Sequence, residues 1–98
     1  VKIVVLNNEF LGMVRQWQEL FFDNRYASTR MINPNFVAIA EGYHIKSKKV
    51  TQREDLDAAV AEMLASKDSY FLEVVVEKEN NVFPMVPQGC SVSEIRLK

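Results

Sequence analysis

The chain has 98 residues, 48% of them hydrophobic, with a formal net charge of −1 at pH 7, one cysteine and one histidine. These totals suit one small domain and argue against a disordered chain, an internal disulfide, a cysteine-rich or multi-histidine metal site, and a general attraction to nucleic acid or anionic membranes. Because no apolar run approaches the ~20 residues that span a bilayer and no signal peptide is visible, we expect a cytoplasmic protein with no nucleic-acid or membrane partner.

The first segment, residues 1–6, is almost wholly apolar. Hydrophobicity that continues without alternation is typical of a strand covered on both faces, as in a parallel sheet, and Asn7 and Asn8 end this strand. Residues 11–22 predict an amphipathic helix, because apolar side chains recur at helical spacing between polar ones, and residues 23–32 predict a polar loop. The apolar side of this helix is expected to contain Val14, Trp17, Leu20 and Phe21.

Asn33 and Pro34 predict the start of a second helix, because asparagine caps free amides and proline suits the first helical position. A short strand is expected within residues 44–50. Thr51 and Glu54 have the spacing of a capping box and predict a third helix. The buried sides are expected to contain Phe36, Val37, Ile39, Ala40 and Tyr43 in the second helix, and Leu56, Ala59, Val60, Met63 and Leu64 in the third.

Residues 70–76 form the last predicted strand, an apolar run broken only by Glu73, and the tail that follows is rich in turn-forming residues. The element order β-α-α-β-α-β predicts an α/β fold, a three-layer α/β/α arrangement with a mostly parallel sheet. Three strands are few for such a sheet, and the sequence begins directly in a strand. We therefore expect residues 1–98 to be the C-terminal part of one domain, with an extended tail over about residues 80–98.

Asn7 and Asn8 lie at the end of the first predicted strand, where open parallel sheets bind their ligands. An amide oxygen is a neutral ligand that suits Mg²⁺, which completes its shell with phosphate oxygens and water. Two consecutive asparagines also make a simple turn with Asx hydrogen bonds. From the residues alone, a metal–diphosphate site and a structural turn both remain open, and Met13 and Trp17 are equally explained as helix core.

The stretch LNNEFLGMVRQWQ, residues 6–18, resembles the end of the thiamine-diphosphate motif in the catalytic (large) subunit of acetohydroxyacid synthase, also called acetolactate synthase. That motif opens with Gly-Asp-Gly and closes with Asn-Asn at the end of the next strand. The resemblance continues through RY, NPNF, LEV and FPMVP, and GMVRQWQ is specific within thiamine-diphosphate enzymes, whereas Asn-Asn marks only the superfamily. It implies that residues 1–98 are the C-terminal part of a thiamine-diphosphate-binding domain.

Position by position, the resemblance implies that Asn8 ligates Mg²⁺ through its side-chain oxygen and Phe10 through its backbone carbonyl. Met13 and Trp17 would line the channel that substrates and inhibitors use. An apolar wall beside the cofactor lowers the local dielectric and excludes water, which favours the less charge-separated forms of the thiazolium. The cofactor-binding residues that the resemblance implies are Asn8, Gly12, Met13 and Val14.

The parent enzyme that the resemblance implies decarboxylates pyruvate on thiamine diphosphate and condenses the product with a second 2-keto acid, in branched-chain amino-acid biosynthesis. Its cofactors are thiamine diphosphate and Mg²⁺, with FAD bound by a domain outside these residues. The implied partners are the remainder of its own large subunit, further copies in a homo-oligomer, and a small regulatory subunit.

None of these 98 residues is predicted to be catalytic. The Gly-Asp-Gly half of the motif, which supplies the charged metal ligand, would precede Val1, and the family's activating glutamate belongs to a different domain. We therefore expect the isolated chain to be inactive. Two alternatives remain: another thiamine-diphosphate carboligase or decarboxylase, and a free-standing, non-enzymatic α/β interaction module in which the two asparagines form only a turn.

Overall fold

The computed structural model describes residues 1–98, which divide into two compact units. The sheet unit comprises residues 1–10 and 31–78. The helix-and-tail unit comprises residues 11–30 and 79–98. The chain therefore leaves the sheet unit directly after the predicted metal-binding loop, and it returns there after the first helix and its loop.

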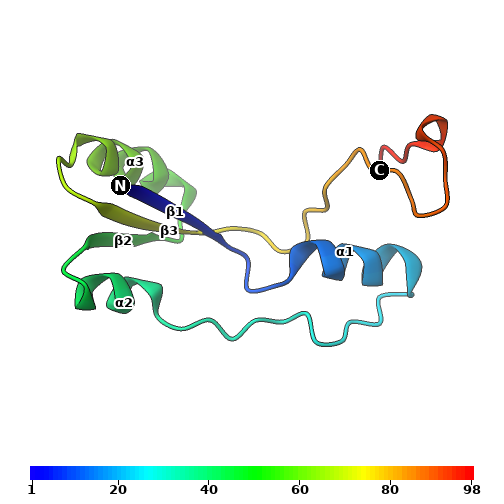
Figure 1. Cartoon of the computed structure of the whole chain (residues 1–98), viewed down its shortest axis with the longest axis horizontal. Coiled ribbons are helices and arrows are strands. Elements are labelled where there is room, and N and C mark those ends of the chain that lie inside the picture. The colour runs from blue at the N-terminus through cyan, green and yellow to red at the C-terminus, as the bar shows by residue number, and fades with distance from the viewer. The chain divides into compact units, whose positions relative to one another are not determined.

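The sheet unit contains a three-stranded parallel sheet (Figure 1). The strands are β1 (Lys2–Asn7), β2 (Lys46–Val50) and β3 (Tyr70–Val75), in the order β1-β3-β2. The apolar β3 is central, because it pairs with both neighbours. The prediction of a parallel α/β sheet is confirmed, and the final pair of the β1–β3 register brings the carboxyl ends of these strands level with each other.

Helices α2 (Phe36–Gly42) and α3 (Leu56–Ala65) cover opposite faces of this sheet (Figure 1). Alternation along β3 produces the arrangement: Leu72 belongs to the core beneath α3, whereas the ring of Phe71 lies 6.4 Å from that of Phe36 in α2. The predicted α/β/α order is thus observed. Each fully buried apolar side chain of the core contributes about 1.5–3 kcal/mol. The core residues are Val50, Ala59, Met63, Tyr70 and Leu72.

Strand β1 lies at the edge of the sheet, and the prediction that both of its faces are covered is wrong for the residues described. Leu6 is 69% exposed, and Ile3 and Val4 are exposed as well. The reason is geometric, because α2 and α3 pack on β2 and β3, and β1 has a strand neighbour on one side only. The continuous apolar run correctly indicated a strand but not the cover over it.

The second helix begins two residues later than predicted. Its N-cap is Asn35, whose side-chain oxygen accepts a hydrogen bond from the Ala38 amide at 3.0 Å. Pro34 therefore precedes the cap instead of opening the helix. Asn33 does not cap, because its side chain donates to Asn7 at the end of β1. Of the predicted buried positions, Ile39 and Tyr43 are exposed.

The predicted capping box at Thr51 and Glu54 is not formed. A short 3₁₀ turn, Arg53–Asp55, leads into α3, and its N-cap residue makes no side-chain capping hydrogen bond. A capping box does exist in the tail, where Ser91 and Glu94 bond reciprocally around the 3₁₀ turn Val92–Glu94. Spacing alone did not distinguish the two because both sequences satisfy it. Leu64, expected on the buried side of α3, is exposed.

The helix-and-tail unit consists of α1 (Gly12–Phe21), the loop after it, and the tail of residues 79–98. The predicted helix is confirmed. The buried residues of α1 are Arg15 and Gln16, whereas Val14, Trp17 and Phe21 are exposed. The tail folds back on itself through an antiparallel bridge between Met85 and Arg96.

Candidate functional site

The carboxyl end of β1 carries a network of side-chain hydrogen bonds centred on Asn7. The buried amide of Asn7 donates from Nδ2 to Oε1 of Glu73 at 2.7 Å. Its Oδ1 accepts from the Glu9 amide at 3.0 Å and from Nδ2 of Asn33 at 2.9 Å. Asn7 is therefore occupied inside the protein and joins β1 to β3, to its own loop and to the segment before α2.

The carboxylate of Glu73 is the buried end of this network. Glu73 is 2% exposed and lies in the middle of β3. Because it is two residues beyond Phe71, it faces the α2 side of the sheet. Lys49 Nζ lies 3.3 Å from the same oxygen that accepts from Asn7. An ionised carboxylate is retained in such a place only when it is paired and hydrogen-bonded, and both conditions hold here.

Asn8 has a different role from that of Asn7. Its side chain is half-buried, and Oδ1 accepts a hydrogen bond from the Phe10 amide at 3.1 Å. This is the Asx turn that the sequence left open. It does not compete with cation binding, since an amide oxygen has two lone pairs and the turn uses one. The structural turn and the metal-binding hypothesis are therefore compatible.

Glu9, between Asn8 and Phe10, has a backbone conformation that residues other than glycine rarely adopt. Its φ is +58°, in the left-handed region. Both backbone groups of Glu9 are hydrogen-bonded. Its amide donates to the side chain of Asn7, and its carbonyl accepts from the Met31 amide at 2.7 Å. The loop after β1 is consequently held in one specific shape by tertiary bonds.

The oxygens of this loop that the resemblance assigns to a metal are the Asn8 side-chain oxygen and the Phe10 carbonyl. Both are neutral, and no group of three or more His, Cys, Asp or Glu side chains could hold a metal ion in the described residues 1–98. Neutral oxygens suit a hard cation such as Mg²⁺ that brings phosphate oxygens and water as further ligands. The donor set thus fits a cation bound together with a diphosphate, and it does not fit a self-sufficient protein cage.

Three of the predicted site residues on α1 are brought together in one apolar hollow. Met13, Val14 and Trp17 line a shallow cavity of about 360 Å³, and Met13 is 52% exposed. The helical spacing of these residues places them on one side of α1. Gly12, also predicted for the site, is the first residue of the helix and immediately precedes them. The alternative that Met13 and Trp17 are helix core does not describe this unit.

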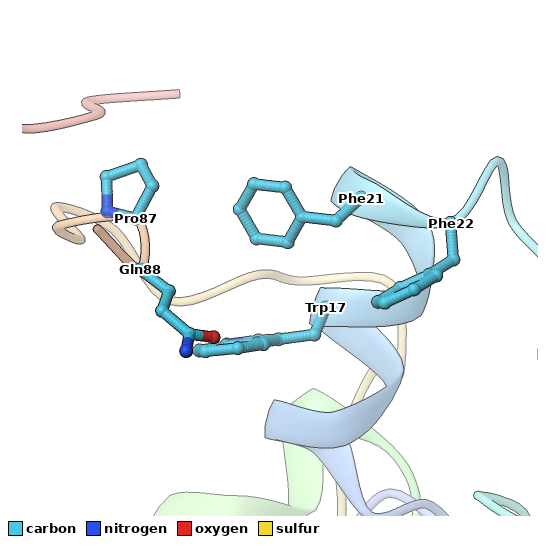
Figure 2. Close-up of a pocket in the computed structure, with 5 residues that line it drawn as sticks. All are labelled: Trp17, Phe21, Phe22, Pro87 and Gln88. Carbon is cyan, nitrogen blue, oxygen red and sulfur yellow. The ribbon is translucent and has the colours of Figure 1, made fainter. Parts of the chain in front are cut away.

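Trp17 also borders a second, smaller pocket of about 140 Å³ (Figure 2). Its indole forms one wall and stands edge-on to Phe21, with ring centroids 5.8 Å apart. Figure 2 shows the side chain of Gln88 reaching toward the indole, with Pro87 beside it. The sequence did not indicate these neighbours, because Phe21 was assigned only to the apolar side of the helix and the tail has no periodicity that indicates where it packs.

The opposite side of α1 explains why its apolar residues are exposed. Arg15 and Gln16 are buried against residues of the tail and the loop. Gln16 bonds to the backbone of Val82, and the Arg15 guanidinium lies 4.6 Å from the Tyr26 ring centroid and 3.6 Å from Glu79. The polar side of α1 is thus the internal side of this unit, and the apolar side is available to a ligand.

A second charged cluster lies on the α3 side of the sheet. Lys46 and Lys48 place Nζ 2.9 and 3.1 Å from the carboxylate of Glu62 in α3. The hydrogen bond from Lys46, followed by that from Lys48, lowers the pKa of Glu62 from 4.5 to about 2. Burial is the main cause that raises the pKa of the adjacent Tyr70. These bonds fasten β2 to α3 and involve none of the predicted site residues.

Comparison with known proteins identifies related sequences. Residues 1–74 match the family described as thiamine pyrophosphate enzyme, C-terminal TPP binding domain. The chain is 44% identical over 97 residues to the mitochondrial acetolactate synthase of Schizosaccharomyces pombe, 45% over 94 residues to the mitochondrial catalytic subunit of Saccharomyces cerevisiae, and 44% over 99 residues to the isozyme 2 large subunit of Escherichia coli. These matches cover 96–100% of the chain but only 14–18% of each relative. None of the helices in this structure combines the length and the apolar character that a bilayer-spanning segment needs.

Proposed function

Because the chain belongs to the thiamine pyrophosphate enzymes, as part of their C-terminal TPP-binding domain, we propose that it is the cofactor-binding part of an acetolactate synthase catalytic subunit. The full protein would decarboxylate pyruvate and condense the two-carbon product with a second 2-keto acid, an early step of branched-chain amino-acid biosynthesis. The observation that carries this proposal is the loop of residues 7–10, which holds the half-buried Asn8 in an Asx turn at the carboxyl end of a parallel strand.

Asn8 and Phe10 are the proposed ligands of Mg²⁺, through a side-chain oxygen and a backbone carbonyl respectively. Their support is the donor chemistry of the loop, which offers neutral oxygens to a hard cation. When bound, thiamine diphosphate supplies the electron sink for decarboxylation. The role of the loop is to fix the diphosphate end of the cofactor, so that the reacting end has a defined position.

The proposed role of α1 is to exclude water beside the cofactor. Gly12, Met13 and Val14 follow the metal loop directly along the chain, and the exposed side chains of Met13 and Val14 form an apolar wall. Such a wall would lower the local dielectric and exclude water from the reacting end of the cofactor. Met13 and Trp17 are proposed to line the channel for the second keto acid and for inhibitors, supported by the hollow that they share.

The remaining parts of the proposal lie outside these 98 residues. FAD, the rest of the large subunit, further copies in a homo-oligomer and a small regulatory subunit are proposed companions, and a charged metal ligand and an activating carboxylate must come from elsewhere. The chain alone is therefore proposed to be inactive. A cytoplasmic location is proposed as well, although the fungal relatives named above are mitochondrial forms.

The experiment that tests the proposal replaces Asn8 by alanine in the full-length protein. We expect Asn8→Ala to raise the Mg²⁺ concentration that half-saturates thiamine diphosphate binding, measured by calorimetry, and to reduce acetolactate formation from pyruvate. The matched control is Asn35→Ala, which removes an equivalent amide at the N-cap of α2. Unchanged Mg²⁺ dependence in Asn8→Ala would remove Asn8 from the metal shell. Release of acetaldehyde without acetolactate in the unaltered protein would indicate a decarboxylase instead.

A further inference from the structure

Glu73 breaks an otherwise apolar central strand, and its burial requires a reason. The side chain is 2% exposed, in a sheet where its neighbours along β3 are tyrosine, phenylalanine, leucine and valine. Replacing a buried, paired carboxylate with an apolar residue is often neutral for stability or favourable. The direct contacts of Glu73 are the Lys49 ammonium at 3.3 Å and the Asn7 amide at 2.7 Å, and the second of these leads to the candidate site.

A carboxylate determines which way the neighbouring amide points. An ionised carboxylate only accepts hydrogen bonds, whereas a carboxamide donates from its nitrogen and accepts at its oxygen. Asn7 must therefore turn Nδ2 toward Glu73, and its Oδ1 is then directed at the loop. The Lys49 ammonium, 3.3 Å from the same oxygen, is a further donor, so Glu73 accepts from both of these partners.

The orientation of Asn7 in turn sets the loop that carries the proposed metal ligands. Oδ1 of Asn7 accepts a hydrogen bond from the Glu9 amide and helps to hold Glu9 at φ +58°. The next amide, that of Phe10, is thereby brought to Oδ1 of Asn8 at 3.1 Å. If Asn7 presented its nitrogen to the loop, two donors would face each other at Glu9, and the turn would lose its anchor.

We propose that Glu73 is a positioning residue that acts through Asn7 to shape the Asn8–Phe10 turn for cation binding. This inference rests on the proposed function, because it presumes a metal held by that turn. Glu73 contacts no cofactor or substrate in this scheme. Its effect is to make one orientation of the Asn7 amide obligatory and thereby to give the loop a single conformation before the cation arrives.

The first test is Glu73→Gln in the full-length protein. A glutamine can present either its oxygen or its nitrogen to position 7, so the Asn7 amide is no longer forced into one orientation. We expect the Mg²⁺ concentration that half-saturates thiamine diphosphate binding, measured by calorimetry without substrate, to rise about 10-fold or more, as is usual when a group behind a metal ligand is lost. The matched control is Glu62→Gln, the same change on the other side of the sheet, which should lower stability without altering the Mg²⁺ dependence.

The second test reverses the polarity of the pair. In the double variant Asn7→Asp with Glu73→Gln, a carboxylate at position 7 accepts from a new amide at position 73, from the Glu9 amide and from Nδ2 of Asn33, and the net charge is unchanged. We expect this variant to recover the Mg²⁺ affinity that Glu73→Gln loses. A purely structural role would instead lower the melting temperature of Glu73→Gln and leave its Mg²⁺ affinity intact. If the single variant does not fold, the double variant still decides.

Three results overturn the inference. An unaltered Mg²⁺ dependence in Glu73→Gln, where Asn8→Ala is impaired, rejects the positioning role and leaves the proposed metal site standing. A double variant that folds but does not regain Mg²⁺ affinity also rejects it, because the orientation of the amide is then not what matters. An unaltered Mg²⁺ dependence in Asn8→Ala removes the metal site itself, and the inference with it.

Discussion

The side chain of Gln16 and the backbone of Val82 form two hydrogen bonds with each other. Nε2 of Gln16 donates to the Val82 carbonyl at 2.9 Å, and Oε1 accepts from the Val82 amide at 2.8 Å. Gln16 is 1% exposed. Its side chain bonds to both the amide and the carbonyl of Val82, as the backbone of a neighbouring strand does in a sheet. This pairing makes the polar side of α1 internal and leaves Trp17 and Met13 facing outward.

Gln16→Leu should detach the tail from α1. A leucine of similar size leaves both backbone groups of Val82 without their side-chain partner, and two hydrogen bonds of this kind together contribute about 1–3 kcal/mol. We expect the free energy of unfolding of the helix-and-tail unit to fall by roughly that amount. The measurement is hydrogen exchange of the Val82 amide at increasing urea concentrations. The exposed Gln52→Leu is the control and should change stability by less than about 0.5 kcal/mol. Equal exchange rates at Val82 in both variants would contradict this account.

The acid stability of the sheet unit should depend on Glu62. Because Lys46 and Lys48 lower its folded pKa to about 2 from 4.5, its stabilising effect is fully present above about pH 4.5 and is lost as the pH falls toward 2. In Glu62→Gln, the free energy of unfolding should be lower at neutral pH and should decline less steeply over that interval. Urea titrations between pH 2 and pH 7 measure the slope. High salt should weaken this pH dependence in the original chain, because these charges are exposed. An identical slope in both proteins would show that the ion pairs of Glu62 with Lys46 and Lys48 are not its source.

Trp17→Leu should change inhibitor binding more than stability. The indole is 37% exposed, and its edge-on contact with Phe21 is worth about 0.5–1.5 kcal/mol beyond the area it buries. In the full-length protein, we expect a modest drop in melting temperature together with a clear change in sensitivity to inhibitors that occupy the channel. Tyr43→Leu, an exposed aromatic in the sheet unit, is the control for a general effect of losing a ring. A large loss of stability with unchanged inhibition would return Trp17 to a core role.

Glycine should be better than alanine at position 9 and worse at position 41. Glu9 has φ +58°, a conformation that costs an L-residue about 1–2 kcal/mol and glycine almost nothing. Glu41 lies within α2, where glycine is about 1 kcal/mol less favourable than alanine. The four single variants, compared by thermal unfolding, should therefore show opposite orders at the two sites. The same order at both would mean that the loop after β1 does not impose the left-handed conformation.

Much of the fold is predictable from local patterns. The two apolar runs became β1 and β3, and the short strand expected within residues 44–50 is β2, although its sequence is mostly polar. The helical spacing of residues 11–22 correctly predicted α1. The direction in which α1 faces was not predictable, because it depends on Gln16 finding Val82 across 66 positions of sequence. The predicted start of α2 was wrong for the same kind of reason. Asn33 and Asn35 are both possible N-caps in the sequence, and only the folded sheet shows that Asn33 bonds to Asn7 while Asn35 caps the helix.

The candidate site was only partly visible in the sequence. The pair Asn7-Asn8 at a strand end was informative, and the resemblance assigned the metal-binding role to the second of the two. Local patterns could not show that the two asparagines differ in role. Asn7 is buried and hydrogen-bonded to Glu73 and Asn33, whereas Asn8 is half-buried and its side chain bonds only within its own turn. Glu73 was noted as an interruption of a strand, but its partner 66 residues earlier appears only once the sheet is assembled.

Trp17, the one tryptophan of the chain, lines both cavities described above. Its indole is partly exposed to solvent. It is therefore a built-in optical reporter of those hollows. Any molecule that enters either of them displaces solvent from the excited ring, so the emission of the 98-residue chain should move toward shorter wavelength without a label being attached. Occupancy of this surface can be titrated directly, even where no turnover occurs.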